Sequence, residues 1–413
     1  MPSDTIHTIT PTIPTSVLYL SYDGLTDPLG QSQVLPYIIG LAKRGYQFTI
    51  ISTEKPEAYE KRKDIIKGLI APFEKKIDWQ PIFYTKKPPV VSTLWDVRKM
   101  RHKAVSLHEK KHFQIVHCRS YITALVGTFL KKKFQIPFIF DMRGFWADER
   151  IEGGIWNLKN PLFRSVYQFF KKKEKEFLQL ADYTISLTFN AKQEIHSWSG
   201  FSTIPIQVIP CCVDTQLFQR KDEVTETNEL TISYLGSLGT WYMLDEMLHF
   251  FRRILLQYPH ARFLFITPDD PEIILHNARK YELSNDHIRI VKAERREVPL
   301  RLVESHISLF FIKPSFSKKA SSPTKMGEIL SMGIPVLCNA NVGDANYLME
   351  NYSPGELVSA FTDVEYDRVI SRLDEIRKIS PESLRQTALD YFDLEKGVDL
   401  YEEVYQKLST ANA

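Results

Sequence analysis

Long apolar runs are absent from this sequence of 413 residues, in which no stretch approaches the roughly 20 apolar residues of a membrane-spanning helix. The first fifteen residues are rich in Thr and Pro and have no apolar core, so we expect no signal peptide and a disordered head at 1–15. Cysteine is scarce, and the four cysteines form neither a CxxC pair nor a metal-ligand pattern with histidine. We therefore expect reduced, buried thiols and a cytoplasmic protein.

Sequence motifs of several enzyme classes are also missing. There is no GxxxxGK[ST] phosphate loop, no GxGxxG dinucleotide fingerprint and no HExxH zinc motif. Asp269 and Asp270 are adjacent and do not form an Asp-x-Asp metal site in a matching context. The net charge of +3 does not favour nucleic acid as the main partner, so we expect none.

Predicted strands and helices alternate along the chain, whose length is suited to two domains. The first βαβ unit consists of a strand at 17–21, a loop at 22–30, a helix at 31–44 and a strand at 48–52. Further strands of this half are expected at 114–117, 138–141, 184–186 and 207–210. The alternation predicts α/β domains whose parallel sheets are covered by helices on both faces.

The second half repeats this pattern after an irregular, charged segment at 219–228, which we interpret as a linker. Its strands are expected at 230–235, 263–266, 288–291, 307–311 and 336–338. We therefore predict a head (1–15), an N-terminal domain (16–218), the linker, a C-terminal domain (229–389) and a final helical segment (390–413).

The most informative segment is Ser321-Ser-Pro-Thr-Lys-Met-Gly-Glu328, which continues as Ile-Leu-Ser-Met-Gly-Ile-Pro-Val. Small polar residues and a proline favour a turn with free backbone N–H groups before a short helix that contains Glu328 and stops at Gly333. Such a helix N-terminus with Lys325 beside it is an anion site, most naturally for a phosphate. The Glu328 carboxylate can accept two hydroxyl hydrogen bonds from a ribose, so the segment predicts nucleotide binding. The alternative is an ordinary loop–helix–strand unit of an α/β protein.

The pattern Ser-Pro-Thr-Lys-x-x-Glu-x-Leu-x-x-Gly-x-Pro-Val resembles the donor-binding segment of retaining, nucleotide-sugar-dependent glycosyltransferases with the GT-B fold, of the bacterial group 1 (family four) type. The resemblance extends from about Val17 to the end of the chain. It implies two Rossmann-like, doubly wound domains facing a cleft, and a last helix that crosses back to the first domain. It also implies metal-independent transfer without a cofactor.

The resemblance assigns donor binding to eight positions, which are Ser321, Ser322, Thr324, Lys325, Glu328, Gly236, Gly30 and Gln31. Gly30 and Gln31 match the glycine-rich loop of the first domain, although the usual glycine pair is reduced to one. Gly236 matches the start of a Gly-Arg-Leu segment, but Ser237 replaces the arginine and residues 240–243 lack the usual lysine. We expect Lys325, which lies within the phosphate loop, to supply the missing positive charge, with Lys313, Lys318 and Lys319 as alternatives.

A second departure concerns the Glu-x7-Glu pattern of the family, in which the first glutamate usually lies beside the sugar ring. Ala320 occupies that position here. Glu328 therefore keeps only the ribose role. Either other groups act near the sugar, or activity is reduced or lost.

Charged and aromatic residues are dense in the loop 141–149, after a predicted strand. We expect catalytic roles for Asp141, Arg143, Asp148 and Glu149, because an arginine among carboxylates suits sugar hydroxyls and developing charge. Acceptor binding is expected from Phe145 and Trp146, and from His117 and Arg119 at the end of another strand. The alternative for this loop is a structural cluster of ion pairs.

Aromatic and basic residues alternate between 156 and 177, and three lysines occur at 131–133. An amphipathic basic helix of this kind can lie on an anionic membrane surface, which would suit a lipid-linked acceptor. The alternative is a packed helix with a lysine-rich face in water.

We therefore expect a glycosyltransferase of the hexosyltransferase type that moves a sugar from a nucleotide-diphosphate sugar to a hydroxyl of a carbohydrate or lipid-linked carbohydrate, with retention. By resemblance, the setting is synthesis of a cell-surface polysaccharide or glycolipid, with peripheral contact at the inner face of the membrane. Two alternatives remain. The first is another GT-B enzyme, either a phosphorylase-like enzyme or a nucleotide-sugar epimerase, which would need no acceptor. The second is a catalytically silent GT-B protein, which would bind a sugar nucleotide or a partner without turnover.

Overall fold

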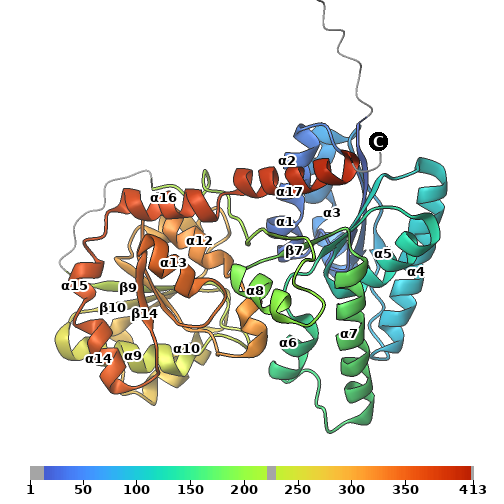
Figure 1. Ribbon diagram of the computed structural model, residues 1–413. Helices are drawn as coiled ribbons and strands as arrows, with labels where there is room; N and C mark the ends of the chain where they lie inside the picture. The colour runs from blue at the N-terminus through green and yellow to red at the C-terminus, as the bar shows by residue number, and fades with distance from the viewer. Residues whose placement is uncertain (1–13, 221–228, 411–413) are drawn as a thin grey trace, which may run out of the picture. The chain divides into compact units, whose positions relative to one another are not determined.

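The computed structural model describes residues 14–220 and 229–410, whose strands form two sheets flanked by helices (Figure 1). The chain divides into two compact units, residues 1–139 with 402–413 (unit 1) and residues 140–401 (unit 2), which we describe separately. The division falls within strand β6 (Phe138–Asp141). The predicted head (1–15) and linker (219–228) lie mostly outside the described residues, and the predicted domain boundaries remain predictions.

Unit 1 is built on parallel strands in the order β3-β2-β1-β5, with β4 also paired to β2. Its strands are β1 (Ser16–Ser21), β2 (Gln47–Glu54), β3 (Ile77–Trp79), β4 (Ile82–Phe83) and β5 (Ile115–Arg119). Its helices are α1 (Pro28–Gln33), α2 (Leu35–Lys43), α3 (Pro56–Ile70), η1 (Ala71–Phe73), α4 (Val91–Lys111) and α5 (Ser120–Phe134). The last residues of α17 (Leu394–Thr410) also belong to unit 1, where Tyr405 packs against Tyr46 at a ring distance of 5.3 Å.

The predicted helix at 31–44 is wrong in its start and its continuity. Helix α1 already begins at Pro28, because proline is well suited to the first turn of a helix, where its missing N–H costs nothing. The chain then breaks at Val34, whose φ of −125° and ψ of −63° are not helical, before α2 begins. Gly30 therefore lies inside a helix and not in a loop before it.

Unit 2 contains the second sheet, in the order β11-β10-β9-β12-β13-β14, and a parallel pair of strands, β7 and β8. The strands are β7 (Tyr183–Ser186), β8 (Ile206–Val208), β9 (Thr231–Leu235), β10 (Arg262–Ile266), β11 (Ile288–Val291), β12 (Ile307–Phe310), β13 (Val336–Asn339) and β14 (Gly355–Val358). Numbered from β9, this is the order 3-2-1-4-5-6 of dinucleotide-binding sheets. The predicted α/β class is confirmed.

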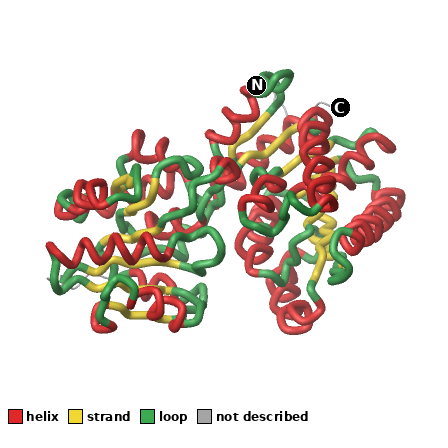
Figure 2. The backbone as a smooth tube through the Cα atoms, turned by 90° about the horizontal axis from the view of Figure 1, so that it is seen from below, coloured by secondary structure: helices red, strands yellow, loops and turns green. Residues whose placement is uncertain are grey.

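Helices cover both faces of the second sheet (Figure 2). In Figure 1, α9 (Leu244–Gln257), α10 (Pro271–Arg279) and α14 (Asp363–Ile370) lie on one side of the strands. On the other side lie α12 (Thr324–Ser331), α13 (Ala345–Tyr352) and α16 (Pro381–Tyr391). The remaining helices of unit 2 are α6 (Trp146–Glu152), α7 (Pro161–Leu180), α8 (Phe189–Ser197), η2 (Asn285–His287), α11 (Val298–Leu302), η3 (Phe316–Ala320) and α15 (Leu373–Ile376).

Buried aromatic side chains fill the space between the second sheet and its helices. The ring centroids of Phe250 on α9 and Tyr366 on α14 lie 5.1 Å apart in an edge-to-face contact. Those of Phe263 and Phe265, both on β10, lie 4.2 Å apart. These rings are fully buried or nearly so. Aromatic pairs at such distances stabilise a core beyond the burial of their area. The strand ends that carry the candidate site are therefore fixed by a dense core beneath them.

Candidate functional site

The candidate site of unit 2 lies where the strand order reverses, between β9 and β12. Ligands of open α/β sheets bind at the carboxyl ends of the strands at such a point. The chain leaves β9 through Gly236, which has a φ of +97° that favours glycine, and its N–H donates to Ile266 O at 2.8 Å. The turn after β9 therefore keeps its backbone close to the strand ends.

Helix α12 supplies the anion-binding part of the site. It begins at Thr324 after Pro323, four residues earlier than Glu328, and no side chain caps its N-terminus. Its first N–H groups are therefore free of side-chain partners and carry the positive end of the helix dipole. The helix ends at Ser331, and Gly333 follows with a φ of +67°, so the predicted stop is confirmed.

Lys325 points from the first turn of α12 toward the turn after β9. Its Nζ atom lies 3.5 Å from the place that a Cβ atom on Gly236 would occupy. The ammonium group lies over the rings of Tyr242 and Tyr234, 3.5 and 4.0 Å from their centroids, and we call these two rings the aromatic cage. Among the described residues it has no hydrogen-bond partner.

Burial holds the pKa of the Lys325 amine well below its ordinary value, although Glu328 and Asp269 act in the opposite direction. Contacts with aromatic faces stabilise a cation but leave its N–H donors unused. A buried ammonium with unused donors is costly unless an anion is bound beside it. Lys325 therefore lies beside the Gly236 turn, and its predicted supply of positive charge to a bound donor remains a prediction.

Glu328 lies one turn further along α12 and has a partner that the sequence did not suggest. Its Oε1 atom accepts a hydrogen bond from Arg295 Nη1 at 2.8 Å. Arg295 also lies over the ring of Phe218, 5.3 Å from its centroid. Burial raises the pKa of Glu328, while Arg295 and Lys325 oppose this shift. Arg295 therefore fixes the orientation of the carboxylate that we expect to bind the ribose.

The turn after β9 lies against a carboxylate from the segment after β10. The Asp269 carboxylate accepts a hydrogen bond from Leu238 N at 2.6 Å and from the Ser237 hydroxyl at 2.9 Å. These hydrogen bonds fix the conformation of the turn, whose residues 236–239 include no lysine or arginine. Within residues 14–220 and 229–410, Lys325 is the lysine whose side chain lies against Gly236.

The turn before α12 is held from several directions. The Ser322 hydroxyl accepts a hydrogen bond from Cys211 N at 3.0 Å, and Ser321 N donates to Lys318 O at 3.2 Å. Gly343 lies so close that a Cβ atom there would be 1.9 Å from Ser321 O. Its φ of +50° also favours glycine. The backbone at 321–324 is therefore preorganised, while the Ser322 hydroxyl already has a protein partner.

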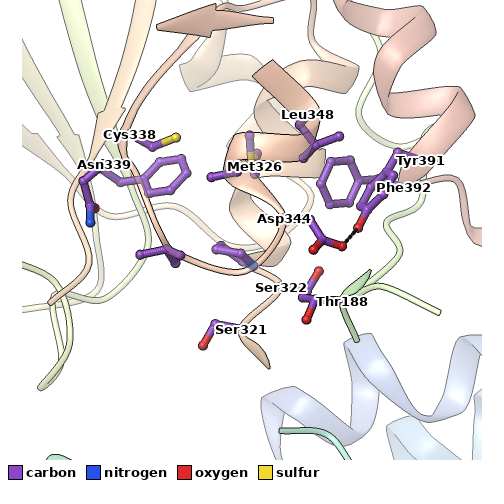
Figure 3. Close-up of a pocket in the computed structure, with 14 residues that line it drawn as sticks. Thr188, Ser321, Ser322, Met326, Cys338, Asn339, Asp344, Leu348, Tyr391 and Phe392 are labelled. Carbon is purple, nitrogen blue, oxygen red and sulfur yellow. Dashed lines mark hydrogen bonds between the residues drawn. The ribbon is translucent and has the colours of Figure 1, made fainter. Parts of the chain in front are cut away.

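A small pocket lies behind this turn, and Figure 3 shows Ser321, Ser322, Thr188 and Asp344 around it. Its volume of about 10 Å³ is close to the space of one water molecule, so it cannot itself hold a nucleotide. The Asp344 carboxylate accepts hydrogen bonds from Tyr391 Oη at 2.5 Å and from the N–H of Phe189 at 2.7 Å. The pocket supports the turn and is not the substrate site.

The loop 141–149 lies against position 320, where the first glutamate of the family pattern is missing. A Cβ atom on Gly144 would lie 3.7 Å from Ala320 O. Arg143, which has a φ of +58°, donates from Nη2 to Cys211 Sγ at 3.3 Å, and its Nη1 lies 3.8 Å from Asp141 Oδ1. The predicted catalytic arginine and the Ser321–Ser322 turn thus both contact Cys211.

Asp148 and Glu149 form the ion pairs that the alternative reading of this loop predicts. Asp148 accepts hydrogen bonds from Tyr167 Oη at 2.9 Å and Lys171 Nζ at 2.7 Å, both from α7. Glu149 accepts one from Lys318 Nζ at 2.7 Å, and this ammonium also lies 3.7 Å from the ring centroid of Trp241. These contacts favour structural roles, and the predicted catalytic roles of both carboxylates remain predictions.

The aromatic residues of the loop pack inward. Phe145 is 1% exposed and stacks on Phe316 at 4.7 Å, so its faces are covered by protein. Trp146 meets Phe170 at 4.9 Å and Trp156 at 5.2 Å. This packing favours support of the loop over direct stacking on a sugar, and acceptor binding by either ring remains a prediction.

Four predicted residues belong to unit 1. Gly30 packs so tightly on the preceding loop that a Cβ atom would lie 2.1 Å from Gly24 O, and Gln31 Nε2 donates to Thr26 O at 3.2 Å. His117 Nδ1 and Tyr405 Oη share a hydrogen bond of 2.7 Å. Arg119 is buried at the end of β5, with Nε 3.5 Å from Asp23 Oδ2. Unit 1 therefore places Arg119 and the loop after β1 at its own point of strand reversal.

Three further findings bear on the sequence predictions. All four cysteines are buried and free of disulfides. Among the described residues there is no group of three or more His, Cys, Asp or Glu side chains that could hold a metal ion. No described helix is long and apolar enough to cross a membrane.

Comparisons with known proteins give a family match for part of the chain and the fold of nearly all of it. Residues 33–217 match the family described as Glycosyltransferase Family 4. No curated protein matches the chain in sequence. Among solved structures, sucrose-phosphate synthase from Thermosynechococcus elongatus matches with a TM-score of 0.72 at 14% identity, over 96% of this chain and all of that one.

Two other solved structures give similar results. HepE from Anabaena, in complex with UDP and glucose, has a TM-score of 0.63 at 14% identity, over 95% of this chain and 99% of its own. UDP-GlcNAc 2-epimerase from Neisseria meningitidis, bound to UDP-GlcNAc, has a TM-score of 0.58 at 14% identity, over 95% of this chain and 100% of its own. The predicted GT-B fold is confirmed. The family match over residues 33–217 and the GT-B fold of the solved structures both agree with the resemblance to group 1 GT-B glycosyltransferases drawn from the sequence.

Proposed function

We propose that the protein transfers a sugar from a nucleotide-diphosphate sugar to an acceptor hydroxyl, with retention and without a metal ion. One observation carries the proposal: the buried Lys325 ammonium has unused donors beside an uncapped helix N-terminus, at the point of strand reversal. The oxygens of a diphosphate carry negative charge and accept hydrogen bonds, so they can pair with both the Lys325 ammonium and the first N–H groups of α12.

In this proposal the bond between the anomeric carbon and the β-phosphate oxygen breaks, the acceptor oxygen bonds to the same carbon, and the acceptor's hydroxyl proton passes to the oxygen of the leaving diphosphate. Lys325 and the first N–H groups of α12 neutralise the charge that develops on the leaving diphosphate. The Glu328 carboxylate, oriented by Arg295 at 2.8 Å, binds the ribose. Arg143 acts near the sugar, because its loop packs against Ala320.

The biological setting that we propose is synthesis of a cell-surface polysaccharide or glycolipid, with the protein in the cytoplasm. The acceptor would then be a carbohydrate or a lipid-linked carbohydrate. Because the HepE structure contains UDP and the epimerase structure contains UDP-GlcNAc, uridine nucleotides are the first donors to test.

The test is a thermal-shift screen of the wild type and of Lys325→Met against UDP, GDP, ADP and their sugar conjugates, with and without EDTA. Binding stabilises the folded state by mass action, so the correct nucleotide raises Tm for the wild type only. A shift that EDTA abolishes would contradict metal-free binding. A sugar isomer formed without acceptor would identify an epimerase, and binding without turnover on any acceptor would identify a silent protein.

A further inference from the structure

Arg119 in unit 1 is a buried arginine whose hydrogen-bonding capacity is largely unused. It is 4% exposed, and its Nε and Nη1 atoms have no hydrogen-bond partner among the described residues. Its nearest carboxylate there is that of Asp23, whose Oδ2 atom lies 3.5 Å from Nε. A guanidinium group stays charged in proteins and has several N–H donors. A buried charge with unused donors is costly unless an anion is bound beside it.

The strand end that carries Arg119 leads directly into a helix. Strand β5 ends at Arg119 and α5 begins at Ser120, with no residue between them. Ser120 has a φ of +70°, in the left-handed region that residues other than glycine rarely adopt, so the chain turns sharply here. No side chain caps the N-terminus of α5, and its first turn contains no acidic residue. The positive end of a helix of 15 residues therefore begins at the residue that carries the guanidinium group.

The neighbouring strand carries a well-fixed loop at the same edge of the sheet. Ser21, the last residue of β1, pairs in register with Arg119, and the loop that follows contains Asp23. Buried Glu54 holds this loop, because its carboxylate accepts a hydrogen bond from Leu25 N at 2.7 Å. The strand order reverses between β1 and β5, which is where ligands of open α/β sheets bind. Elements of unit 1 thus fix Arg119 at a position suited to a ligand.

The contact with Asp23 leaves room for a second anion. The Asp23 side chain is 44% exposed, so water screens its charge, and ion pairs of this kind contribute little. Its carboxylate lies near Nε, while Nη1 remains without a hydrogen bond in the described part of the chain. Because its donors point in several directions, a guanidinium group can bind one oxyanion while it keeps another.

We propose that unit 1 contains an anion site, formed by Arg119 and the N-terminal turn of α5, and that it binds a phosphate or carboxylate group of the sugar acceptor. The oxygens of both groups match the planar fork of donors on arginine, and such charge-assisted hydrogen bonds are strong. A neutral hydroxyl would leave the buried charge without compensation. The role of acceptor rests on the proposed sugar transfer, whereas the anion site itself does not.

The test separates this site from the donor site by using the full chain with Lys325→Met as the parent protein. Thermal shifts are recorded at constant ionic strength with inorganic phosphate, glucose 6-phosphate, glucuronate and glucose. Binding stabilises the folded state by mass action, so an anionic probe should raise Tm and glucose should not. Arg119→Gln, added to this parent, should lower the affinity for that anion about 10-fold to 100-fold, since charge-assisted hydrogen bonds are lost. Arg119→Lys keeps the charge without the fork and should give an intermediate affinity.

Arg98→Gln is the matched control, because it removes one arginine charge from an exposed position on α4 of the same unit. It should bind the anions as the parent does, and urea unfolding should show that every variant is folded. Equal anion affinity of Arg119→Gln and its parent would overturn the proposal. A parent protein whose Tm rises with none of the anionic probes would overturn it as well, whatever the folding of the Arg119 variants.

Transfer assays with the donor found in the nucleotide screen show whether the acceptor supplies the anion. The wild type should have a higher kcat/KM for a phosphorylated or uronic acid acceptor than for its neutral counterpart, and Arg119→Lys should lower this ratio. A preference for the neutral acceptor, or one that follows the charge of the donor sugar instead, would overturn the acceptor assignment. Failure of the proposed sugar transfer would appear separately, as a wild type that binds no nucleotide, and would leave the result with Arg119→Gln unchanged.

Discussion

Replacing Lys325 with methionine removes the ammonium group but keeps an unbranched side chain that fills the aromatic cage. The ligand-free protein should become more stable, because the wild type keeps a buried amine with no hydrogen-bond partner among the described residues. Removing an unsatisfied buried polar group is worth about 1–3 kcal/mol. The affinity for the nucleoside diphosphate should fall by at least about 30-fold, or about 2 kcal/mol, because a buried charge pair is lost.

The difference in unfolding free energy between Lys325→Met and the wild type should change with pH in a defined direction. The pKa of Lys325 is lowered in the folded protein, so the unfolded chain holds the proton more tightly. The stability of the wild type should therefore rise with pH between the folded pKa and the ordinary value of 10.5. The advantage of the variant should be largest at the lower end of this range and should shrink, as pH approaches that value, to the cost of burying the unsatisfied neutral amine. Urea unfolding across the range measures the difference.

Nucleotide binding should also take up a proton at a pH above the folded pKa, because the diphosphate raises the pKa of Lys325. Calorimetry in buffers with different ionisation enthalpies detects this uptake, and Lys325→Met should lack it. Lys318→Met is the matched control: it removes another buried lysine, but one paired with half-exposed Glu149, so it should lose about 1 kcal/mol. A Lys325→Met variant that binds the nucleotide as tightly as the wild type would refute the assignment. Marked destabilisation of that variant would show that the amine is structural.

Three further substitutions test other parts of the site. Glu328→Gln should weaken binding of the ribonucleotide about 10-fold but that of the 2′-deoxy form less, since a charge-assisted hydrogen bond is lost; equal losses in calorimetry would remove the ribose role. Arg143→Ala should leave the nucleotide Kd unchanged, while the rate of sugar transfer, measured by chromatography of the product, should fall about 100-fold or more. Full turnover by this variant would exclude the loop from catalysis. Gly343→Ala should weaken nucleotide binding without contacting the ligand, because its Cβ atom would lie 1.9 Å from Ser321 O; unaltered affinity and Tm would show that the 321–324 turn tolerates displacement.

Local pattern was sufficient to predict much of the fold. The strands at 230–235 and 336–338 are found within one residue as β9 and β13, because apolar β-formers bounded by turn residues carry their own signal. Helix α1 was misplaced because glycine favours loops, whereas Gly30 lies in a helix that packs closely on Gly24 of the preceding loop. Strand β14 (Gly355–Val358) was missed, since four residues beside a turn give little periodicity.

The candidate site shows the same division between local and tertiary information. The roles of Lys325 and Glu328 could be proposed from one helix start and its spacing. The partners of these residues could not: the aromatic cage comes from β9 and the turn after it, and Arg295 comes from the segment after β11. A lone arginine or tyrosine has no local signature of such a contact. The inward packing of Phe145 likewise depends on Phe316, which is 171 positions later in the chain.

The contacts of Asp344 have a consequence for work with fragments and chimaeras. Its carboxylate is buried, and its pKa is raised by that burial, while its hydrogen-bond donors include the N–H groups of Phe189 and Asn190. A fragment cut at 219–228 would keep the carboxylate but lose both donors, and would also expose the apolar surface around it. Expression of the C-terminal segment alone should therefore give insoluble material. An exchange of donor segments between relatives should succeed only if residues 188–190 are transferred together with residues 318–344.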